Sequence, residues 1–98
     1  MARDLDALLK QVHDEASFTA FVQALAEDFE EEREIERIKP STSYSPGALG
    51  WENGTVDAVL GAAAAWGRAT GMNPSSETAV QNPWRRCAHI LYAGKFYE

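Results

Sequence analysis

Apolar residues recur with a helical period over residues 18–29 and then give way to a dense run of acids. If this segment is a helix, one side of it carries, over three turns, Phe18, Phe21, Val22, Leu25, Ala26 and Phe29. The positions that would extend this stripe hold Glu32, Arg33 and Glu36. The pattern predicts an amphipathic helix that either ends near residue 32 or continues beyond the core as an exposed arm.

Three further helices are predicted from periodicity and capping residues. Leucines and Val12 share one side of residues 3–13, and Asp14 or Ser17 can cap the helix that follows. Asn53 or Thr55 can cap a third helix, whose stripe consists of Val56, Val59, Leu60, Ala63, Ala64 and Gly67, with Gly71 as its stop. Asn82-Pro83 begins a fourth helix. This last helix is apolar on more than one side, so we expect it to be central, with Trp84 and Trp66 in the core.

The segment 39–54 is predicted to be one long loop, because it carries two prolines, three glycines and four hydroxyl residues. It also holds Tyr44 and Trp51. Trp51 either packs onto the core or stands exposed as an aromatic contact for a partner. No alternating or β-branched run indicates a strand. The sequence therefore predicts an all-α domain over residues 1–98, a small bundle of about four helices with one long loop.

The chain has 98 residues and a formal net charge of −6, all of it in residues 1–39. Nucleic acid is a poor direct partner for such a chain, because affinity for phosphate comes mainly from Lys and Arg. No apolar run is long enough to span a membrane. A single cysteine allows no internal disulfide, which favours a cytoplasmic setting.

Residues capable of catalysis or metal binding are few and poorly spaced. Cys87 and His89 are two apart on a helix and so point in nearly opposite directions, which argues against a shared metal ion. Cys87 lies on the apolar stripe, and we expect it to be a small core residue. No glycine pattern indicates a phosphate or cofactor site. The expectation is a protein that is not an enzyme and has no cofactor or metal.

The acidic run after residue 26 has a defined geometry. Glu27, Glu30, Glu31 and Glu34 fall within about 100° of one another on a helix. Such a ridge can simply be a solvated face, or it can be a docking surface that steers a basic partner. Together with Tyr44 and Trp51 these acids are the candidate partner-binding residues.

Two stretches of the chain resemble a small bacterial domain family of unknown function. They are Gly50-Trp51-Glu52-Asn53, and Asn82-Pro83-Trp84 running into Ile90-Leu91-Tyr92-Ala93-Gly94-Lys95-Phe96-Tyr97-Glu98. The helix around Phe18, Phe21 and Leu25 is also similar, so the resemblance covers most of residues 11–98 except 39–49 and 72–81. It implies a fold and transfers no catalytic residues.

In size and acidity the chain is similar to immunity proteins that neutralise toxins. The preferred functional hypothesis is therefore a non-catalytic immunity or inhibitor protein that occludes a basic protein partner. Two alternatives stay open: a self-associating structural or regulatory module, which would be a homodimer, and an acidic mimic of nucleic acid.

Overall fold

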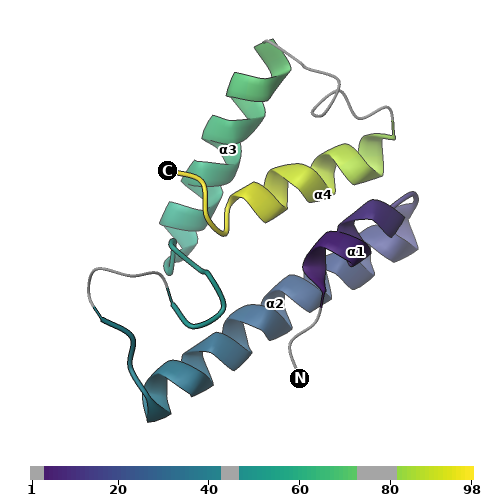
Figure 1. The fold of residues 1–98 in the computed structure, drawn as a ribbon. Helices are drawn as coiled ribbons and strands as arrows, with labels where there is room; N and C mark the ends of the chain where they lie inside the picture. Colours follow the sequence, from purple (N-terminus) through teal and green to yellow (C-terminus); the bar gives the residue numbers. More distant parts are fainter. Residues whose placement is uncertain (1–3, 43–46, 73–81) are drawn as a thin grey trace.

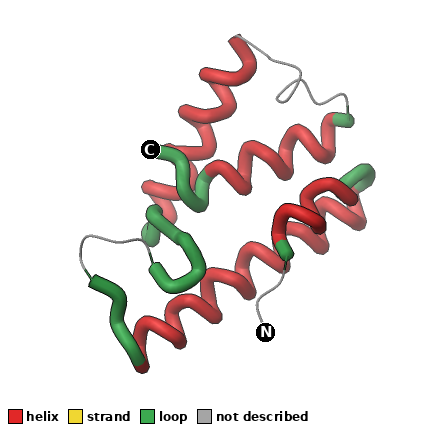
Figure 2. The backbone as a smooth tube through the Cα atoms, viewed as in Figure 1, coloured by secondary structure: helices red, strands yellow, loops and turns green. Residues whose placement is uncertain are grey.

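The computed structural model describes residues 4–42, 47–72 and 82–98. They form four helices, α1 (Leu5–Gln11), α2 (Glu15–Ile38), α3 (Val56–Met72) and α4 (Pro83–Ala93), which Figures 1 and 2 show. These segments hold no strand, so the predicted all-α class with about four helices is confirmed. None of the four helices is long and apolar enough to cross a membrane.

The helix starts are set by side chains that accept hydrogen bonds from free backbone N–H groups. Asp14 and Ser17 form a reciprocal capping box, in which the Asp14 carboxylate accepts from the Ser17 N–H at 2.8 Å. Asn82 caps α4 and Pro83 takes its first position, as the sequence predicts. At α3 the capping hydroxyl belongs to Thr55, which accepts from the Ala58 N–H at 3.3 Å.

Helix α4 is the centre of the arrangement, as its apolar residues predict. It packs against α1, α2 and α3, whereas α3 contacts no helix other than α4. In Figure 1 α3 lies on one side of α4, and α1 and α2 lie on the other. Helices α2 and α3 are therefore held apart, and each leaves one side without a helical neighbour.

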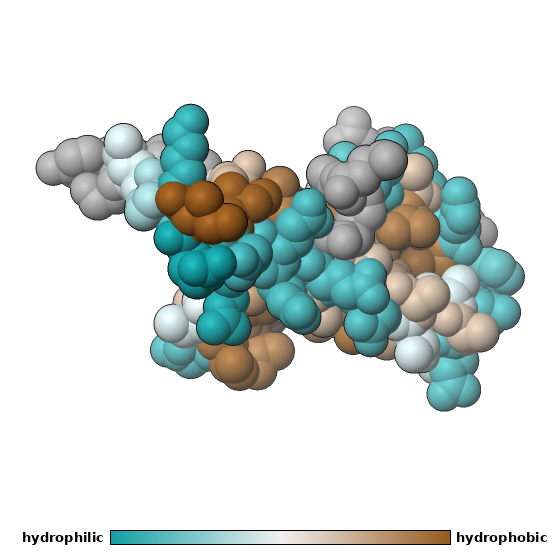
Figure 3. All heavy atoms as spheres, turned by 90° about the horizontal axis from the view of Figure 1, so that it is seen from below, coloured by the Kyte–Doolittle hydropathy of each residue, from teal (hydrophilic) through white to brown (hydrophobic). Residues whose placement is uncertain are grey.

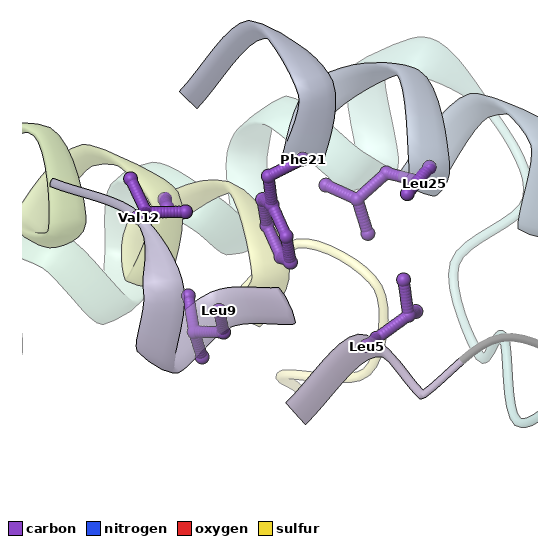
Figure 4. Packing of buried hydrophobic residues seen from close by; sticks show 7 residues of the cluster. Leu5, Leu9, Val12, Phe21 and Leu25 are labelled. Atoms are coloured by element: carbon purple, nitrogen blue, oxygen red, sulfur yellow. The ribbon is translucent and has the colours of Figure 1, made fainter. Parts of the chain in front are cut away.

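The apolar core lies where α1, α2 and α4 meet. Figure 4 shows Phe21 and Leu25 of α2 close to Leu5 and Leu9 of α1 and to Val12, which follows α1. The Phe21 side chain is only 1% exposed, and Ala88 of α4 is fully buried in the same cluster.

The buried face of α2 differs from the predicted stripe. It consists of Phe21, Ala24, Leu25, Asp28 and Glu32, whereas Val22 and Ala26 are exposed. At 100° per residue this face is rotated by about 70° from the centre of the predicted stripe. The helix continues to Ile38, but not as a fully exposed arm, because Glu32 is buried beneath the loop that follows.

Two expectations for α4 were wrong. Cys87 is exposed, not a core residue. Trp84 is 37% exposed and packs only at the edge, against Phe18 at 5.7 Å between ring centroids. The physical reason is that two opposite sides of α4 pack against its neighbours, one side against α1 and α2 and the other against α3. Ala88 faces α1 and α2, Ile90 meets α3 beside Gly67, and Cys87 lies at the margin between them.

We predict that Phe21→Ala lowers the free energy of unfolding by about 3–5 kcal/mol, because it leaves a cavity in the core. The matched change Phe96→Ala, at a side chain that is 44% exposed, is expected to cost about 1 kcal/mol. Urea unfolding followed by circular dichroism measures both values. Equal losses would contradict the placement of the core where α1, α2 and α4 meet.

Candidate functional site

Two of the acidic residues on α2 are buried, although the sequence places them in a run of solvated acids. Asp28 is 3% exposed and Glu32 is 5% exposed. They extend the face of Phe21 and Leu25 at helical spacing. A buried carboxylate is costly unless it is hydrogen-bonded and paired, so both require partners from elsewhere in the chain.

Asp28 finds its partners in the loop and at the C-terminus. Its Oδ2 accepts from the Lys95 Nζ at 3.0 Å and from the Trp51 indole Nε1 at 2.8 Å. The Lys95 and Asp28 side chains are 10% and 4% exposed, so this is a buried ion pair. The Lys95 ammonium also lies 5.5 Å from the centre of the Trp51 ring, within the range of a cation–π contact.

Glu32 binds the backbone of the same loop. Its Oε1 accepts from the N–H groups of Leu49 at 2.9 Å and Trp51 at 3.1 Å. The loop closes on itself, since the Gly47 N–H donates to the Trp51 carbonyl at 3.1 Å. Gly50 has a φ of +88°, a conformation that other residues rarely adopt, and it makes this turn possible.

The loop is fixed in turn to the end of the chain. The Lys95 carbonyl accepts from the Glu52 and Asn53 N–H groups at 3.0 and 3.3 Å. The Asn53 side-chain amide donates to the carbonyls of Gly94 at 3.0 Å and Tyr97 at 3.1 Å. We call Asp28, Glu32, Trp51 and Lys95 the Asp28 cluster. It joins α2, the loop before α3 and the residues after α4.

An open groove of about 470 Å³ lies next to this cluster, between α2 and the start of α3. One wall is formed by Leu25, Ala26 and Phe29 of α2, and the other by Val56, Val59 and Leu60 of α3. Trp51 also lines the groove, and its ring meets that of Phe29 edge-on at 4.9 Å. Among the described residues, the charged ones that line the groove are Glu30 and Arg33, one turn apart on α2.

The groove walls leave apolar side chains in water. Val56 is 76% exposed and Leu60 is 55% exposed, both in the first turns of α3. In Figure 3 hydrophobic residues lie at the surface directly beside hydrophilic ones. Exposed apolar surface that is rimmed by charge is typical of a protein-interaction site.

The four predicted ridge acids lie in different surroundings. Glu27, Glu30 and Glu34 are exposed and Glu31 is half-buried. Glu27 accepts from the Gln23 amide at 3.1 Å, and Glu34 is paired with Arg37, which holds the pKa of that carboxyl below its ordinary value. Of the four, only Glu30 lines the groove.

The two predicted aromatic contacts also have different outcomes. Trp51 is half-buried, so it packs onto the structure through Asp28 and Phe29 and also presents part of its surface to the groove. Tyr44 lies outside the described residues.

The polar groups with catalytic potential lie apart from the groove. His89 stacks on Trp66 with a ring separation of 6.3 Å, and burial together with the charges of Arg86 and Arg85 lowers its pKa. Within the described ranges, no three His, Cys, Asp or Glu side chains converge as a metal site would require.

Sequence reasoning missed Asp28, Glu32 and Lys95. One signal was available, because Glu32 occupies a position that continues the apolar stripe of α2. An acid at a core position indicates either the end of the buried face or a buried, paired carboxylate, and here it is the second. The hydrogen-bond partners of Glu32 are 17 and 19 residues away, and those of Asp28 are 23 and 67 residues away, so helical periodicity could not identify them.

Comparison with known proteins matches residues 14–98 to the model of a family of unknown function (DUF7660). Neither the curated proteins nor the solved structures contain a match.

We predict that Asp28→Asn and Lys95→Met each destabilise the protein by about 3–5 kcal/mol, because each leaves a buried charge without its partner. The double variant is expected to lose clearly less than the sum of the two single losses. Chemical denaturation of all four proteins measures this coupling. Additive losses would mean that the pair does not act as a unit.

We predict that Gly47→Ala destabilises the protein by about 1–3 kcal/mol. A Cβ at this position would collide with the Glu32 carboxyl group and displace it from the Leu49 and Trp51 N–H groups. The control is Gly54→Ala, where a Cβ meets no atom within 4 Å, and it should change stability by less than about 1 kcal/mol. Thermal unfolding of both variants tests the contact.

Proposed function

The chain belongs to the DUF7660 family of unknown function, and we propose that it is a non-catalytic protein-binding domain of the inhibitor or immunity type. It would bind and occlude a basic protein partner. The surface proposed for this role combines the groove between α2 and α3 with the acidic side of α2. The observation that carries the proposal is that an open apolar groove has one wall on the most acidic helix of the chain.

The charge of α2 supports a basic partner. The helix holds eight acidic and two basic residues. Asp28 and Glu32 are committed to the fold, and Glu34 is paired with Arg37. Glu30 is exposed and makes no hydrogen bond or ion pair with the described residues. A clustered negative potential accelerates encounter with a basic surface, and a free carboxylate at a groove edge is available for an ion pair.

The groove supports a lasting complex rather than an encounter alone. Apolar burial supplies most of the affinity in protein complexes, and aromatic residues near the centre of an interface contribute strongly. Trp51 is held rigidly by its indole hydrogen bond to Asp28, so little ordering cost would accompany binding at this position. In this proposal the acids set the association rate and the groove sets the dissociation rate.

We also propose that the residues of the family resemblance serve as the scaffold of this surface. Trp51, Asn53, Gly94 and Lys95 hold the loop against α2 and the C-terminus through the contacts described above. The binding specificity would then reside in the side chains that line the groove and its edge.

The experiment uses the full chain as bait in a lysate of the organism that encodes it, followed by surface plasmon resonance with the purified partner. We predict that Glu27→Lys/Glu30→Lys reduces the association rate at low salt by about tenfold or more. The wild-type rate should fall as salt is raised, because screening shortens the range of the steering field. Adding Glu31→Lys and Glu34→Lys should enlarge the loss.

The matched control is Glu52→Lys/Glu98→Lys. Both double variants replace two carboxylates by two ammonium groups, which takes the net charge from −6 to −2. Glu52 and Glu98 are exposed and do not line the groove. The control should alter the rate much less. An equal effect of both variants, or a partner indifferent to either, would refute a role for the acidic side of α2.

A further inference from the structure

We propose that the groove between α2 and α3 receives one amphipathic helix of the basic partner. The apolar side of that helix would pack on Trp51, Phe29 and Leu60, and a basic residue would pair with Glu30. This inference rests on the proposed function and names the structural class of the ligand.

The walls of the groove are two helices that are fixed by other parts of the fold and do not pack closely on each other. Helix α3 packs on α4 alone, and α2 packs on α1 and α4. The exposed apolar side chains Ala26 on α2, and Val56 and Leu60 on α3, therefore border the same open space. Helix α4 packs against both α2 and α3 on one side. An additional helix in the groove would pack against both of them on the other side.

The distribution of polar groups favours a helix over a small ligand. Sites for small molecules combine apolar walls with several polar groups that converge on the ligand. Here the charged groups, Glu30 and Arg33, belong to a single helix, and the facing wall on α3 is formed by Val56, Val59 and Leu60. In helix-in-groove recognition, an amphipathic helix lays its apolar face, with anchors at i, i+3, i+4 and i+7, into a hydrophobic groove.

Charge decides between a partner helix and a second copy of this chain. A second copy would bring another α2, with its eight acids, towards the same surface. Like charges in close apposition disfavour such a complex. Glu30 and Arg33 lie one turn apart on α2. The bound helix would therefore carry a basic residue opposite Glu30 and could carry an acidic residue one turn away, opposite Arg33.

The test uses a synthetic peptide of about 18 residues, long enough to form a helix on its own. It carries Leu at i, i+3, i+4 and i+7 and Lys on the remaining face, and a scrambled peptide of the same composition is the reference. Binding to the full-length protein is measured by fluorescence anisotropy, and the contact surface is mapped by NMR shifts of backbone amides and of the Trp51 indole. The expected result is a set of shifts confined to residues 25–33 and 51–60, with at least tenfold weaker binding of the scrambled peptide.

Two exposed alanines of α2 provide a matched pair of variants. Ala26→Gln places a long polar side chain in the groove, whereas Ala20→Gln makes the same change at an exposed position that does not line it. Ala26→Gln and Leu60→Gln should each weaken binding at least tenfold, and Ala20→Gln should stay within about twofold of wild type.

The outcomes separate this inference from the proposed function. Loss of binding in Glu27→Lys/Glu30→Lys but not in Ala26→Gln would support the acidic side of α2 as the binding surface. It would refute the groove as the site of the helix. Loss of binding only in Ala26→Gln and Leu60→Gln would support the groove as the binding site and contradict the proposal of a basic partner. Shifts outside the groove, equal binding of the scrambled peptide, or a dimer in light scattering that Ala26→Gln dissociates would each overturn the helix proposal.

Discussion

The buried ion pair between Asp28 and Lys95 fixes the residues after α4 to α2, in addition to the packing of these two helices on each other. It lies where α2, the loop before α3 and the residues after α4 meet, and Trp51 donates to the same carboxylate oxygen. Removing two charges from water is expensive, and the cost is offset here because the Lys95 ammonium and the Trp51 indole both donate to the Asp28 carboxylate. Glu32 extends this arrangement by binding the loop backbone.

The same interaction explains the open groove. Burying Asp28 and Glu32 turns α2 so that Ala26 and Phe29 lie at the edge of the core, facing the start of α3. Trp51 of the loop lines the groove between α2 and the start of α3, and the two helices do not pack on each other. A polar cluster thus leaves an apolar surface available, and it does so on the most acidic helix of the chain. The proposed binding surface depends on this combination.

Sequence patterns were reliable where the determining contacts are local. Asp14, one of the two caps predicted for α2, and the Asn82-Pro83 start of α4 act within four residues. The central role of α4 also follows from its own apolar residues. The prediction that Cys87 is a core residue was wrong because packing on two opposite sides of α4 leaves a margin whose position depends on where α1, α2 and α3 lie.

The sequence by itself determined that the described segments form four helices and where α2 and α4 begin. It also determined that the negative charge collects in the first 39 residues. These properties depend on periodicity, capping and composition, which operate over a few residues. Only the tertiary structure decided which acids are buried and which face water. Asp28 and Glu30 are nearly identical in sequence context, yet one is paired in the interior and the other stands at the groove. The reason is that Lys95, 67 residues from Asp28, can reach only one face of the helix.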